Sequence, residues 1–124
     1  MGPLKACKSE LWLRPGKKPT QGASLEKGRD NGGGVGVVLG AGNQGFLTVI
    51  DTLDVLFCQN EVCLVKHHPI REYNVPYFAR LFACLIEGGF MDQICCETIE
   101  EASAIVYHPA VSHVHMTGGK VDAT

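Results

Sequence analysis

Three short stretches carry groups that could hold an anion or a carbonyl oxygen. "GAGNQG" (40–45) follows an apolar run and combines glycines with the amide of Asn43. Lys66 and His68 stand in "KHHP", and "TGGK" (117–120) lies near the end of the sequence. Glycines let a ligand approach the backbone closely, and helix N-termini bind phosphates through backbone N–H groups. Nucleotide binding and a plain turn between a strand and a helix are the two interpretations of 40–45.

The spacing of the glycines does not decide between these interpretations. Gly40, Gly42 and Gly45 match the pattern G-x-G-x-x-G, but one such match is a weak signal. No acid ends the second predicted strand, where a dinucleotide-binding fold places the carboxylate that holds a ribose. Lys66 stands at that position instead.

The elements that must position these groups alternate between strand and helix after residue 34. Short apolar runs such as "VGVVL" and "VCLVK" are typical of strands buried in a parallel sheet. Strands are predicted at 35–39, 62–66, 90–96 and 112–117, and helices at 46–57, 75–87 and 99–107. The order predicts an α/β fold: a partial, truncated Rossmann-like domain with a mostly parallel sheet and flanking helices. Phe46, Phe78 and Phe82 are predicted core residues.

Charge and composition divide the chain near Gly34. Residues 1–34 hold seven Lys or Arg against three acids and are rich in glycine and proline, which predicts a loose basic segment. Residues 35–124 hold four Lys or Arg against ten acids and are predicted to form the partial nucleotide-binding domain. The net charge of -2 gives no reason to expect nucleic acid as a partner. With no apolar run long enough to span a bilayer, a cytoplasmic protein without membrane partners is predicted.

The stretch from Gly36 to Thr124 resembles the cofactor-binding domain of the aldehyde dehydrogenase superfamily, in a divergent branch. Asn43 matches the asparagine that this family uses in its oxyanion site, and Lys66 matches the lysine at the end of the next strand. "HPAVSHVHMTGG" matches the family's "HPxVDxVxFTGS" segment. "ARLFACLIEGGF" matches its helix that ends in a glycine before the next strand.

The resemblance implies an oxidoreductase that uses NAD or NADP. Lys66 would bond the adenosine ribose, His68 would line the cofactor groove, and Gly118 and Gly119 would let the dinucleotide pass close to the backbone. Asn43 would be the catalytic donor to the developing oxyanion. The glycines of "GAGNQG" would leave room for the substrate. The implied partners are an aldehyde or an activated acid, together with a second copy of the chain or a missing catalytic segment.

Three departures from the family pattern predict that the chain is inactive alone. Pro69 replaces the acid that helps to hold the ribose, and Gly119 replaces a serine. The cysteine nucleophile and the glutamate base of the family lie beyond the segment that matches, and the sequence ends at Thr124. The family's chemistry needs a thiolate to attack the aldehyde before hydride can leave.

Two other interpretations compete with a fragment of an oxidoreductase. The first is a non-catalytic remnant or interaction module. The second is a metal-binding module, because His113 and His115 share one face of a strand. Carboxylate or thiol partners at a defined spacing are missing, so no metal site is predicted. The six cysteines show no C-x-x-C spacing and are interpreted as reduced, buried thiols.

Overall fold

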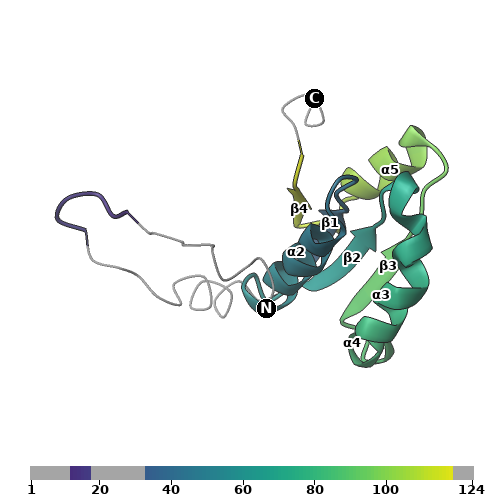
Figure 1. Ribbon diagram of the computed structural model, residues 1–124, viewed down its shortest axis with the longest axis horizontal. Helices are drawn as coiled ribbons and strands as arrows, with labels where there is room; N and C mark the ends of the chain where they lie inside the picture. Colours follow the sequence, from purple (N-terminus) through teal and green to yellow (C-terminus); the bar gives the residue numbers. More distant parts are fainter. Residues whose placement is uncertain (1–11, 18–32, 119–124) are drawn as a thin grey trace, which may run out of the picture.

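The computed structural model describes residues 12–17 and 33–118, and its centre is a four-stranded parallel sheet (Figure 1). The strands are β1 (Val35–Leu39), β2 (Val62–Lys66), β3 (Met91–Ile94) and β4 (His113–Met116). Their order across the sheet is β3-β2-β1-β4, with every neighbouring pair parallel. The predicted α/β, Rossmann-like fold class is confirmed.

Helices cover both faces of the sheet. They are α2 (Gly45–Phe57), the 3₁₀ helix η2 (Pro69–Asn74), α3 (Val75–Leu81), α4 (Ala83–Glu87) and α5 (Ile99–Val106). Successive side chains of a strand point to opposite faces. Val38 packs in the core with Val55 of α2 and Phe78 of α3, whereas its neighbour Leu39 lines a groove together with Ile99 of α5. Therefore α2 and α3 lie on one face and α5 lies on the other.

The second predicted helix, 75–87, is divided in two at Phe82. This residue has φ -107 and ψ 18, and its buried ring lies 5.0 Å from the ring of Phe78. Asn74 ends η2 in a helical conformation directly before α3 and makes no side-chain cap bond. Thr98 caps α5, since its hydroxyl accepts a hydrogen bond from the N–H of Glu101 at 3.2 Å.

The side of α2 that packs on the sheet differs from the side that its apolar residues predict. Phe46 was predicted to be a core residue, and this is wrong, because 58% of its surface is exposed. The buried residues of α2 are Thr48, Asp51, Thr52 and Val55. Phe78 and Phe82 are buried as predicted.

Among residues 12–17 and 33–118, no helix has both the length and the apolar character needed to cross a membrane.

Candidate functional site

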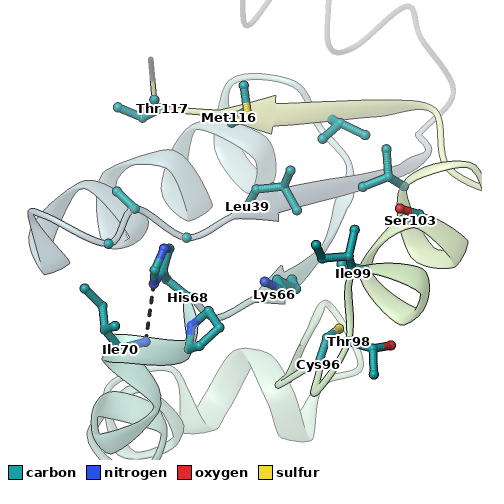
Figure 2. Close-up of a pocket in the computed structure, with 18 of the residues that line it drawn as sticks. Leu39, Lys66, His68, Ile70, Cys96, Thr98, Ile99, Ser103, Met116 and Thr117 are labelled. Carbon is teal, nitrogen blue, oxygen red and sulfur yellow. Dashed lines mark hydrogen bonds between the residues drawn. The ribbon is translucent and has the colours of Figure 1, made fainter. Parts of the chain in front are cut away.

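The carboxyl ends of the four strands meet at one edge of the sheet, where an open groove of about 1190 Å³ lies. Because β2 and β3 lie on one side of β1 and β4 on the other, the path of the chain reverses beside β1. Ligands of open parallel sheets bind at such a switch point. The groove walls come from the residues that follow each strand and from α5 (Figure 2).

Lys66 ends β2 and extends its side chain into this groove. It pairs in register with Leu39 of β1, so both side chains leave the sheet on the α5 side. Figure 2 shows the Lys66 side chain below Leu39 and beside Ile99. Within the described part of the chain, no carboxylate lies within 4.0 Å of its ammonium group. The cation therefore remains available to a ligand.

The other residues expected at the site follow β1, β2 and β4. Asn43 is exposed at the groove, and its side chain makes no hydrogen bond with the described residues. His68 lines the groove, and its Nδ1 accepts a hydrogen bond from the N–H of Ile70 at 3.3 Å. Gly118 also lines the groove, whereas Gly119 lies outside the described residues. The structure thus brings four of the five expected residues to one groove.

The glycines of "GAGNQG" serve the packing of the chain itself. A Cβ on Gly42 would lie 2.9 Å from Nε2 of His68, and one on Gly40 would lie 3.1 Å from the carbonyl oxygen of Lys66. Neither glycine has a positive φ. The expectation that these two glycines leave room for a substrate is therefore wrong, because the imidazole of His68 and the end of β2 fill that space.

Arg71 of η2 fixes the loop that carries Asn43. Its Nε donates to the carbonyl oxygen of Gly42 and its terminal nitrogen to that of Asn43, both at 2.8 Å. The guanidinium also donates to the hydroxyl of Tyr73. Arg71 was not among the predicted site residues, because its partners are backbone carbonyls, which give no signal in a sequence.

Replacing Arg71 with alanine is expected to lower the free energy of unfolding by about 1–2 kcal/mol, since two loop carbonyls lose a charged donor. Urea denaturation would measure the change. Arg80→Ala is the matched control, because Arg80 is exposed on α3 and should change the stability by less than about 0.5 kcal/mol. Equal effects of the two substitutions would contradict the assigned role of Arg71.

A buried carboxylate ties β4 to α2 behind the groove. Asp51 accepts a hydrogen bond from the hydroxyl of Thr117 at 3.0 Å, and its second oxygen lies 3.2 Å from Nε2 of His115. Nδ1 of His113 lies 2.6 Å from Glu61 Oε2. This role of Asp51 was not predicted from the sequence.

The histidines do not support a metal site. His113 and His115 share a face as expected, but each is paired with a different carboxylate. The ring of His67 is buried against Phe78, and its Nε2 is hydrogen-bonded to Gln93 at 2.8 Å. Within the described residues, no three His, Cys, Asp or Glu side chains are grouped so that they could hold a metal ion.

Two of the cysteines have a pKa that their surroundings raise. Burial raises the pKa of Cys63 to about 12, and burial together with Glu72 raises the pKa of Cys95 despite the opposing charge of Lys66. Cys63 and Cys96 are buried, as expected, but Cys84 and Cys95 are exposed, so the prediction of buried thiols is wrong for these two. A thiol with a raised pKa forms little thiolate at neutral pH.

The chain was compared with known proteins by sequence and by structure. No protein-family model, curated protein or solved structure matched it. The fold class therefore rests on the sheet itself, and the resemblance to aldehyde dehydrogenases stays a prediction.

Proposed function

We propose that the groove binds NAD or NADP and that the chain is the cofactor-binding part of an aldehyde dehydrogenase-like oxidoreductase of the cytoplasm. The observation that carries the proposal is Lys66, whose ammonium group extends into an open groove at the switch point of a parallel sheet and has no carboxylate partner among residues 12–17 and 33–118. The volume of about 1190 Å³ is above the usual range for small-ligand pockets and accommodates an extended dinucleotide.

Each groove residue has a role that its chemistry permits. The ammonium group of Lys66 has three donors for the ribose hydroxyls of the cofactor. His68 forms the wall between the "GAGNQG" loop and η2, and Gly118 lets a ligand approach the end of β4. The exposed amide of Asn43 would donate to the carbonyl oxygen of an aldehyde or an activated acid. A bound dinucleotide would supply the hydride-transfer chemistry.

The proposed activity needs groups from outside this chain. Burial raises the pKa of Cys63 and of Cys95 and so opposes thiolate formation at both. We therefore propose that a missing catalytic segment, or another chain, supplies the nucleophile and the general base. The isolated chain would bind the cofactor without oxidising an aldehyde.

Lys66→Ala is expected to weaken the binding of NADH or NADPH about tenfold, which corresponds to the loss of roughly 1.4 kcal/mol from one charge-assisted contact. Cofactor fluorescence or calorimetry with the full chain would measure the affinity. Lys17→Ala is the control, because Lys17 is exposed and does not line the groove. If a folded chain binds neither cofactor, or if both substitutions act alike, the proposal fails.

A non-catalytic interaction module is the second candidate. Large apolar side chains of α2, including Phe46 and Phe57, are more than half exposed. Exposed apolar stretches of this kind mark interaction surfaces. A folded chain that binds no cofactor but associates through α2 would favour this candidate over the first.

A further inference from the structure

Helix α2 presents an apolar stripe on the side that faces away from the sheet. The stripe consists of Phe46, Ile50, Leu53 and Phe57, whose exposed fractions are 58%, 54%, 39% and 57%. The opposite side of the helix is buried through Thr48 and Val55. We call these four residues the outer stripe.

The spacing of the outer stripe is that of a helix that pairs with another helix. Its members follow one another at intervals of four, three and four residues, which is the spacing of the apolar positions in a coiled coil. Thr48 and Val55 fall at the heptad position farthest from such a contact, in agreement with their burial against the sheet. The same helix can therefore pack on the sheet and pair through its outer side.

The outer stripe also has the same pattern in both directions. Its ends are phenylalanines, its two middle residues are aliphatic, and the intervals are symmetric about the midpoint between Ile50 and Leu53. When two antiparallel helices pair about a two-fold axis, the residues near the start of one helix contact those near the end of the other, so both ends of the stripe must be compatible. This symmetry favours a second copy of the chain over an unrelated partner.

We propose that two copies of the chain associate through α2, with the two helices antiparallel about a two-fold axis. Ile50 then contacts Leu53 of the second copy, and Phe46 contacts Phe57 of the second copy. Each contact occurs twice, so that aromatic side chains meet aromatic ones and aliphatic side chains meet aliphatic ones. The contact lies on the face of the sheet opposite to α5 and the groove and does not depend on cofactor binding.

The charges of α2 permit this arrangement. The helix contains no Lys or Arg, and its two acids are Asp51 and Asp54. Asp51 is buried beside β4, and Asp54 accepts a hydrogen bond from Gln59 at 3.3 Å. Under the two-fold, the flanking residue of the second copy nearest to Asp54 is Leu47, so like charges do not meet. The dipoles of antiparallel helices attract each other.

The area of the outer stripe predicts a weak dimer. Aromatic side chains bury roughly 150–250 Å² each when fully covered, so the four partly exposed residues offer about 350 Å² per chain. The pair would then bury about 700 Å² in total, less than the roughly 1,600 Å² of a standard stable interface. A reversible dimer that forms in the micromolar range or above is therefore expected.

Sedimentation of the full chain over a range of concentrations tests the dimer. The wild-type chain should shift from monomer to dimer as concentration rises, and Ile50→Lys and Leu53→Glu should each abolish the shift. Both positions are exposed, so each variant should keep the circular dichroism spectrum of the monomer. Tyr77→Lys, at an exposed apolar position on α3, should leave the dimer intact.

Mixing the two single variants gives the sharper result. In the mixed pair, the lysine introduced at position 50 faces the glutamate introduced at position 53 of the other chain, while Leu53 still faces Ile50. The mixture should therefore dimerise at concentrations where each variant alone is a monomer. A monomeric wild-type chain with normal helix content would overturn the proposal, as would a dimer that survives both substitutions or a mixture that stays monomeric.

Discussion

Gly36→Ala is expected to lower the free energy of unfolding by about 3 kcal/mol, a large part of the stability of a small domain. Gly36 lies in β1 beneath α2, where a Cβ would be 2.6 Å from Cγ1 of Val55 and 2.9 Å from Oε2 of Glu61. Val55 is fully buried and cannot move aside, so β1 and α2 would have to separate. Chemical denaturation followed by circular dichroism would measure the loss.

Gly45→Ala is the matched control, since it makes the same chemical change at the start of α2. A Cβ there would lie 3.4 Å from Nδ2 of Asn74, which is an ordinary contact. Alanine restricts the unfolded chain more than glycine does, so stability should stay equal or rise by about 0.5–1 kcal/mol. A similar loss at both positions would show that the close approach of α2 to β1 is not what makes Gly36 necessary.

The sequence predicts the strands better than it predicts the faces of the helices. The runs at β1 and β2 are apolar and rich in valine, and these two strands begin and end at the predicted residues. The orientation of α2 was not predictable in this way. Its buried Asp51 is satisfied by His115 and Thr117, which lie more than sixty residues away along the chain. Local periodicity contains no information about such a partner.

The position of the candidate site was predictable from the sequence, but the contacts that shape it were not. The groove lies where the sequence places the strand ends, because parallel strands bring their carboxyl ends to one edge. Arg71 could not be identified, since it lies in a 3₁₀ helix without apolar periodicity and binds carbonyl groups of Gly42 and Asn43. The role of Gly42 was also misjudged, because the sequence does not show that the ring of His68 occupies the adjacent space.

Asp51→Ala is expected to lower the free energy of unfolding by about 3 kcal/mol and to loosen β4. The substitution leaves the hydroxyl of Thr117 and the imidazole of His115 without their shared acceptor. Among the described residues β4 pairs only with β1, at the edge of the sheet, so these side-chain bonds are a large part of what holds it. Hydrogen exchange of the β4 amides should accelerate more than exchange in β2.

Asp54→Ala is the control for this effect, because Asp54 lies one helical turn along α2 and its side chain contacts only Gln59 among the interactions of the described residues. Its cost should stay below about 1 kcal/mol, without a change in β4 exchange. Asp51→Asn should fall between wild type and Asp51→Ala, since an amide oxygen can still accept from Thr117 but lacks the charge that faces His115. Met116, Thr117 and Gly118 form one wall of the groove, so a loosened β4 should also weaken cofactor binding. If Asp51→Ala destabilises the chain while β4 exchange stays unchanged, Asp51 supports α2 alone and does not position that wall.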